Sequence, residues 1–110
     1  MIFDRDDVVV VPFPFDDMLV RKRRPVVVLS GKTFNAANGQ TVVAMITTAK
    51  ETDWPSDLAI QELGEAGLKQ HCVIRMRLLT IPNGLIVRQI GVLAGVDRQA
   101  LAQLFDAVFH

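Results

Sequence analysis

Arginine and threonine side chains are the residues of this chain whose type and position could do chemistry. Arg24 is the last of four consecutive basic residues and stands directly before Pro25. A proline restricts the preceding residue to extended backbone, so a strand behind it would fix the direction of the Arg24 side chain. A planar guanidinium on a rigid element is suited to binding a phosphate or the extra charge of a pentacovalent phosphorane.

Two further groups of polar residues are weaker candidates when taken alone. Arg21, Lys22 and Arg23 are expected on a looser loop, where they form either a solvated turn or a mobile cationic surface. Thr47 and Thr48 end an expected strand. Hydroxyl groups in such places more often satisfy backbone groups than take part in catalysis.

Metal binding and covalent catalysis receive little support from the sequence. The two histidines, His71 and His110, are far apart, and Cys72 is the only cysteine, so the spacing of a zinc site is absent. His71 and Cys72 cannot form a nucleophile pair on a strand, because neighbouring side chains point to opposite faces. We therefore expect no metal and no other cofactor, and we expect Cys72 to be a small core residue.

Runs of β-branched residues predict the strands that would position these groups. The expected strands cover about residues 7–13, 25–31, 41–48, 71–79 and 85–93. Pro25 would open the second of them, a position where a strand tolerates proline. Asn38-Gly39 predicts a hairpin turn between the second and the third. In the fourth, Arg75 and Arg77 share one parity, so both should lie on the polar face.

One segment near the C-terminus has the spacing of an amphipathic helix. Leu101, Leu104, Phe105 and Val108 recur at i, i+3, i+4 and i+7, and Asp97 is expected as the N-cap. Five or six short strands followed by one helix predict a mainly β fold, a small bent antiparallel sheet or barrel.

The overall composition limits the classes of protein that remain. The chain has 110 residues, half of them hydrophobic, and a formal net charge of zero, so we expect a single domain over residues 1–110. This balance excludes a disordered tail or a histone-like basic protein. The longest apolar stretch, residues 8–15, is far below the ~20 residues that span a bilayer. A cytoplasmic protein is expected, because no secretory signal and no cysteine pair are present.

Several segments, in order along the chain, resemble the MazF/PemK-like toxins of bacterial type II toxin–antitoxin systems. They are "DVVVVPFPFDDM", "KRRPVVVLS", "VAMITTA", "GLKQHCVIRMRLLTI" and "IGVL". The resemblance implies an SH3-like antiparallel β-barrel with short helices and a homodimer. It also implies an mRNA interferase: a metal-independent, sequence-selective endoribonuclease of single-stranded RNA that inhibits translation and growth. Its products would carry 2′,3′-cyclic phosphate and 5′-hydroxyl ends.

The same resemblance implies roles for individual residues. The arginine of the family's Arg-Pro motif falls on Arg24, and the family's active-site threonine falls on Thr47, which makes these two the expected catalytic residues. RNA binding is expected from Arg21, Lys22, Arg23, Phe15, Thr48 and Arg77. A cognate antitoxin is implied as well, with a disordered tail that blocks the RNA groove.

This sequence also departs from the family pattern. The acidic loop found before Arg-Pro in many members is missing, and only Asp16 or Asp17 could replace a glutamate there. The chain has no tyrosine, so base stacking would depend on phenylalanine or on Trp54. Two other functions stay open: a binding-only toxin on the same fold, such as a gyrase poison resembling CcdB, or an inactive RNA-binding relative.

Overall fold

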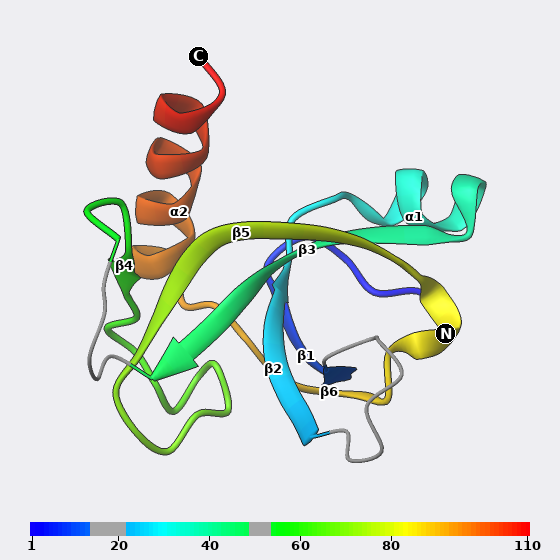
Figure 1. The fold of residues 1–110 in the computed structure, drawn as a ribbon, viewed down its shortest axis with the longest axis horizontal. Coiled ribbons are helices and arrows are strands. Elements are labelled where there is room, and N and C mark those ends of the chain that lie inside the picture. Colours follow the sequence, from blue (N-terminus) through cyan, green and yellow to red (C-terminus); the bar gives the residue numbers. More distant parts are fainter. Residues whose placement is uncertain (14–21, 49–53) are drawn as a thin grey trace.

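The computed structural model describes residues 1–13, 22–48 and 54–110. Six antiparallel strands, in the order β4-β5-β3-β2-β1-β6, form one sheet that curls into half of a barrel (Figure 1). The strands are β1 Asp7–Phe13, β2 Lys22–Val28, β3 Gln40–Thr48, β4 Leu58–Ala59, β5 Cys72–Pro82 and β6 Arg88–Val92. The helices are α1 Lys32–Asn38, the 3-10 turn η1 Asn83–Leu85 and α2 Gly95–Val108. The predicted mainly β fold with a C-terminal helix is confirmed.

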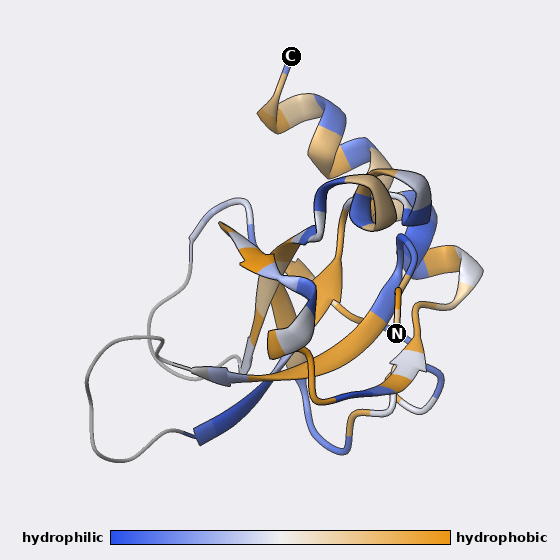
Figure 2. Ribbon diagram, turned by 90° about the vertical axis from the view of Figure 1, so that its right-hand side faces the viewer, coloured by the Kyte–Doolittle hydropathy of each residue, from blue (hydrophilic) through white to orange (hydrophobic). Residues whose placement is uncertain are grey.

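Buried β-branched side chains cover both faces of the sheet. Val8 of β1 packs in a cluster with Leu101 of α2, whereas the next residue, Val9, packs in a second cluster with Phe3. Successive strand residues point to opposite faces, so one run of valines supplies both clusters. Figure 2 shows these strands as mainly hydrophobic. The strands that carry the candidate residues are therefore held in place by buried side chains on both faces of the sheet.

Strand β2 begins three residues earlier than expected. Lys22, Arg23 and Arg24 are all paired with β1, so the expectation that the first two lie on a loose loop is wrong. The start of β2 is hydrophilic and exposed (Figure 2). Pairing of β2 with β3 begins only at Val26, which leaves Pro25 at an edge position. A proline without an N–H group is tolerated at such an edge.

The predicted hairpin turn at Asn38-Gly39 is wrong, because helix α1 lies between β2 and β3. Gly39 has a φ of 65° and is the C-cap of α1, and its N–H donates to the carbonyl of Asn35 at 3.1 Å. The Asn35 side chain is buried and donates to the carbonyls of Phe3 and Ser30. Asn-Gly supplies the positive φ that both a hairpin and a helix C-cap need, and the tertiary contacts of Asn35 favour the helix.

Asp97 is not the N-cap of α2. The helix begins at Gly95 with Ala94 as N-cap, and Asp97 lies in the first turn. Its buried carboxylate accepts the backbone N–H groups of Gln61 at 2.9 Å and Glu62 at 3.0 Å. A first-turn carboxylate also favours the positive end of the helix dipole. Asp97 therefore attaches the segment before β5 to the base of α2.

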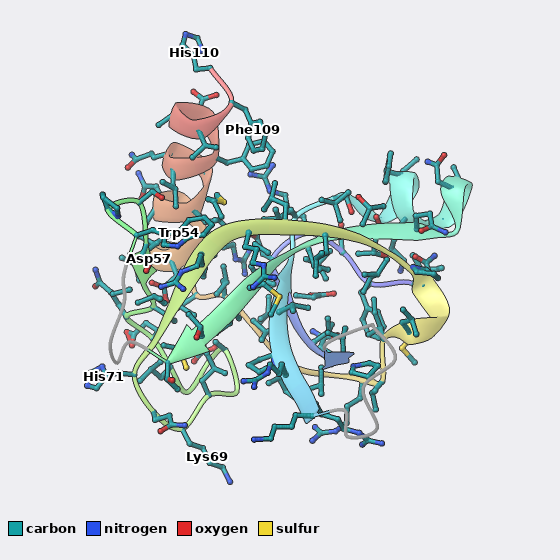
Figure 3. All side chains as sticks on the ribbon, in the orientation of Figure 1. Trp54, Asp57, Lys69, His71, Phe109 and His110 are labelled. Atoms are coloured by element: carbon teal, nitrogen blue, oxygen red, sulfur yellow. The ribbon has the colours of Figure 1, made fainter. Side chains whose placement is uncertain are left out.

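Only the first half of α2 packs on the sheet. Leu101 is buried, whereas Val108 and Phe109, at the far end, are 42% and 57% exposed. Figure 1 shows the helix extending away from the sheet, and Figure 3 places Phe109 near its tip. The predicted apolar stripe is therefore a core contact in its first turns only. Within the described part of the chain, no helix has the length and apolar character needed to cross a membrane.

Candidate active site

Strands β2 and β3 bring Arg24 and Thr47 together. Val26 of β2 pairs with Met45 of β3, and the same register continued for two residues sets Arg24 opposite Thr47. Opposite residues of an antiparallel pair have their side chains on the same face. Both residues line one pocket of about 250 Å³. The two residues expected to be catalytic, 23 positions apart in the sequence, thus share a site.

Strand β5 adds two more arginines to this pocket. Met45 pairs with Arg75, but Ala44 pairs with Leu78, so β5 carries extra residues at this point. Such a bulge bends a strand and redirects its side chains. The residues that line the pocket are Arg24, Met45, Ile46, Thr47, Arg75 and Arg77. We call this set the arginine pocket.

The residues of the arginine pocket are of the types that bind an anion. Its lining has three guanidinium groups and one hydroxyl but no carboxylate, imidazole or thiol. Its volume is below the ~300–1,000 Å³ of typical small-molecule sites, which favours one charged group of a larger ligand. Over residues 1–13, 22–48 and 54–110, no three His, Cys, Asp or Glu side chains gather as a metal site requires. Arginine is thus the cationic group that the pocket offers.

One of these arginines is held by a carboxylate just outside the pocket. Arg75 donates from Nε to Asp57 Oδ1 at 3.1 Å and from Nη2 to Oδ2 at 2.8 Å. The Asp57 and Arg75 side chains are only 7% and 17% exposed. The hydrogen bond from Arg75 lowers the pKa of Asp57 from its ordinary value. The pair therefore stays ionised at neutral pH.

The basic run that precedes the proline is divided between the two faces of β2. Lys22, Arg23 and Arg24 are all exposed. By strand alternation, Lys22 shares the face of Arg24 and Arg23 points to the other face. Arg21 and Phe15, also expected to bind RNA, lie outside the described residues. Among the described residues of the basic run, Lys22 is therefore the one that could extend the cationic surface of the pocket along β2.

Of the two remaining candidates, Arg77 and Thr48, the structure brings only Arg77 to the pocket. Arg77 lines the arginine pocket, but Thr48, next to Thr47 on β3, points to the opposite face by alternation. Arg75 was not among the expected site residues. Its parity with Arg77 indicated a shared polar face, but the bulge that brings both to one pocket has no signature in the sequence.

Cys72 is a core residue, as expected. It is 7% exposed, and burial raises the pKa of its thiol. A protonated buried thiol is a poor nucleophile. His71, beside it, is exposed.

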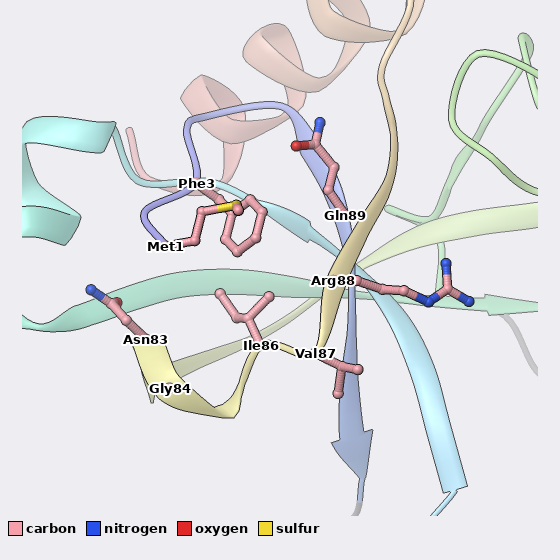
Figure 4. A pocket seen from close by; sticks show the side chains of 8 residues that line it. All are labelled: Met1, Phe3, Asn83, Gly84, Ile86, Val87, Arg88 and Gln89. Carbon is pink, nitrogen blue, oxygen red and sulfur yellow. The ribbon is translucent and has the colours of Figure 1, made fainter.

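A larger hollow of about 550 Å³ lies on another part of the molecule (Figure 4). Met1, Phe3 and Ile86 give it an apolar wall. Arg88 stands at its edge, and Figure 4 shows this side chain extending away from Phe3. The hollow is larger than the arginine pocket, but among the described residues that line it Arg88 has the only charged side chain, so it is the weaker candidate for catalysis.

The fold is shared with several solved toxin structures. A Mycobacterium tuberculosis toxin, MazF-mt6, is 25% identical, with 94% of this chain and 95% of that chain covered and a TM-score of 0.74. The MazF of a MazE-MazF crystal structure from Deinococcus radiodurans is 15% identical, with 99% and 96% covered and a TM-score of 0.75. An endoribonuclease in complex with its cognate antitoxin, from a mycobacterial species, is 12% identical, with 96% and 91% covered and a TM-score of 0.73.

A family model decides the assignment that the resemblance predicted. Among curated proteins, none matches the chain. The model of the PemK-like, MazF-like toxin of type II toxin-antitoxin system matches residues 4–109, nearly the whole chain. The match spans both β2 and β3, and hence the Arg24–Thr47 pair. This chain therefore belongs to the family of PemK-like, MazF-like toxins of type II toxin–antitoxin systems.

Proposed function

We propose that this toxin is an endoribonuclease that cleaves single-stranded RNA without a metal ion. The observation that carries the proposal is the meeting of Arg24 and Thr47 in one cationic pocket. The family assignment supports it, as does the similarity of fold to a mycobacterial endoribonuclease. Single-stranded RNA is the substrate that the resemblance implies, and its unstacked bases are open to contact while a phosphate occupies the pocket.

The proposed reaction is an internal transfer within the RNA. The ribose 2′-oxygen attacks the adjacent phosphorus and loses its proton to a base, the bond from phosphorus to the 5′-oxygen breaks, and that oxygen gains a proton. The products are a 2′,3′-cyclic phosphate and a 5′-hydroxyl end. Arg24 stabilises the extra negative charge of the phosphorane, and Thr47 positions the phosphate by a hydrogen bond.

The base that accepts the 2′-proton is not among the residues that line the pocket. Arginine remains protonated in proteins and is a poor base. Asp16 and Asp17, the only acidic residues near the basic run, lie outside the described residues. The arginine pocket thus supplies charge stabilisation and positioning, the larger part of catalysis in many enzymes.

Two partners are proposed on the basis of the family. The neighbouring structures include complexes of MazF with MazE and of an endoribonuclease with its cognate antitoxin, so we propose a cognate antitoxin for this toxin and a homodimer as its active form. The exposed basic start of β2 suits an acidic antitoxin tail.

Arg23→Glu should lower the affinity for the antitoxin and make that affinity less dependent on salt, because one attractive charge is reversed. A titration at two salt concentrations measures both effects. Unchanged affinity would mean that the tail binds elsewhere.

Catalysis is tested by cleaving a long single-stranded RNA in EDTA and mapping the product ends. Arg24→Lys keeps the charge but loses the planar fork, so the cleavage rate should fall by roughly 10² or more, as expected on losing one preorganised donor. RNA binding should weaken far less. Arg88→Lys, the same exchange at an exposed arginine of β6, is the matched control and should cleave normally.

Three results would contradict this mechanism. They are full activity of the Arg24→Lys protein, a strict need for a divalent metal, and products with 5′-phosphate ends. Growth inhibition by Arg24→Lys at the level of the natural sequence, with no RNA cut, would favour a binding-only toxin of the gyrase-poison type instead.

A further inference from the structure

An acidic, a cationic and an aromatic side chain form one unit beside the arginine pocket. The Asp57 carboxylate accepts hydrogen bonds from Nε and Nη2 of Arg75, at 3.1 Å and 2.8 Å. The guanidinium also lies over the Trp54 ring, 5.3 Å from its centroid. Figure 3 shows Trp54 and Asp57 next to each other. The plane of the guanidinium is therefore fixed along one edge and on one face.

Backbone pairing builds this unit. In the short ladder between β4 and β5, Leu58 pairs with Ile74. The same register continued by one residue sets Asp57 opposite Arg75. The turn before β4 is closed by two hydrogen bonds, from Asp57 N–H to the Trp54 carbonyl and from Trp54 N–H to Asp57 Oδ2, both at 2.9 Å. The carboxylate thus has a fixed place before it meets the arginine.

Stability alone gives little reason for such a pair. Burying two charges costs desolvation energy that their attraction only partly offsets, and apolar residues of similar size are often as stable. Arg75, however, also lines the pocket that holds Arg24 and Thr47. A guanidinium whose plane is already fixed can meet a phosphate without reorganising, which is the condition for strong transition-state stabilisation.

We propose that Asp57 is a positioning residue, which together with Trp54 holds Arg75 as a second phosphate-contacting guanidinium of the arginine pocket. This inference rests on the proposed function. It assigns to Arg75 a contact with the RNA backbone, and to Asp57 and Trp54 the task of orienting that contact.

Charge and orientation predict opposite effects when Asp57 is neutralised. Removing a negative charge near the pocket should tighten the binding of RNA, because the local potential becomes more positive. Losing the orientation of Arg75 should slow the cleavage step. A variant that binds at least as tightly but cuts more slowly therefore separates positioning from a general effect of charge or of folding.

The first experiment compares Asp57→Asn with the natural sequence. We expect kcat to fall about 10- to 100-fold, and the affinity for an uncleavable 2′-deoxy oligonucleotide to stay equal or increase. Asp57→Glu, which restores the carboxylate, should recover part of the rate. Asp106→Asn, which removes one exposed charge on α2, is the matched control and should cleave normally. A folded Asp57→Asn protein with the natural rate would overturn the proposal.

A double-mutant cycle tests whether Asp57 acts through Arg75. Arg75→Lys should reduce kcat by a similar factor, and adding Asp57→Asn to it should cost little more, because the orientation is already lost. Independent effects that multiply would show that Asp57 acts elsewhere and would overturn the assignment.

Trp54 gives a readout that needs no cleavage. It is the only tryptophan of the chain, so its emission reports on this unit alone. Saturation with the 2′-deoxy oligonucleotide should change the emission of the natural sequence and change it less in Arg75→Lys. No change at saturation would overturn the proposed contact. If the natural sequence cuts no RNA, the proposed function fails, and the emission then still decides whether Arg75 contacts the polymer.

Discussion

Among single residues, Thr47 and Arg24 are the pair that we propose to act on one phosphate, the first through its hydroxyl and the second through its guanidinium. Thr47 is half-buried at the end of β3, and its neighbour Thr48 is half-buried in the same strand. The two threonines differ mainly in the face of the sheet to which they point. Only Thr47 lies where a hydroxyl could donate to an anion held by Arg24.

This difference predicts different effects of the same exchange. Thr47→Ala should lower the rate of RNA cleavage by roughly 10², because one donor to the transition state is lost. Thr48→Ala should lower it much less, and both proteins should remain folded. Cleavage rates and thermal unfolding of the two variants check this. A larger loss in Thr48→Ala than in Thr47→Ala would contradict the arrangement.

At the scale of elements, the segment between β4 and β5 is fastened to its neighbours by backbone contacts that only glycine permits. Gly67 has a φ of +75°, and a Cβ there would lie 2.1 Å from the carbonyl oxygen of Ile90 in β6. A Cβ at Gly91 would lie 2.3 Å from the carbonyl carbon of Ala66. A backbone hydrogen bond also joins the segment to β6: the N–H of Val92 donates to the Glu65 carbonyl at 3.0 Å. This segment leads directly into β5, the strand that carries two arginines of the pocket.

Gly67→Ala should therefore destabilise the protein by ~2–4 kcal/mol, because a positive φ and a backbone clash are combined. Gly64→Ala is a matched control in the same segment, since a Cβ there has no heavy atom of the described residues within 4 Å. Its effect should stay within about 0.5 kcal/mol. Urea unfolding of both variants gives the comparison. Equal stabilities would mean that the segment is not held closely against β6.

At the scale of the whole molecule, the far half of α2 has an apolar surface that the described chain leaves exposed. Val108 and Phe109 are 42% and 57% exposed, and the Phe105 and Phe109 rings lie 4.7 Å apart. A chain of this size buries only about two thirds of the surface of its unfolded state. Pairing with a second copy would cover the helix, in accordance with the proposed homodimer.

Sedimentation at micromolar concentration should accordingly give twice the 12.2 kDa mass of the chain. If α2 lies in the interface, Phe109→Lys should shift the protein towards the monomer, because a charge would have to be buried. Gln99→Lys, at an exposed polar position of the same helix, should leave the mass unchanged. A monomer of the natural sequence would contradict the homodimer.

The strands with strong β-branched runs, the terminal helix and the family could all be predicted from the sequence. The valine runs at residues 8–11 and 26–28 can form little else than buried strands, because their stiff side chains suit a pleated sheet. Arg24 could be chosen because it stands directly before Pro25 and the strand that follows, whereas the choice of Thr47 rested on the resemblance to the MazF/PemK-like toxins. The family model then confirmed the assignment over residues 4–109.

Which polar residues come into contact could not be predicted, because it depends on how distant segments pack. Asn38-Gly39 became a helix end because Asn35 found buried partners in distant segments. Asp97 became an anchor for a loop 35 positions away because the fold brings that loop to the helix. Arg75 lines the pocket because of a bulge in β5, and it is held by a carboxylate from the turn before β4. Local patterns fix backbone preference, whereas register and contacts between distant segments depend on the packing of the whole chain.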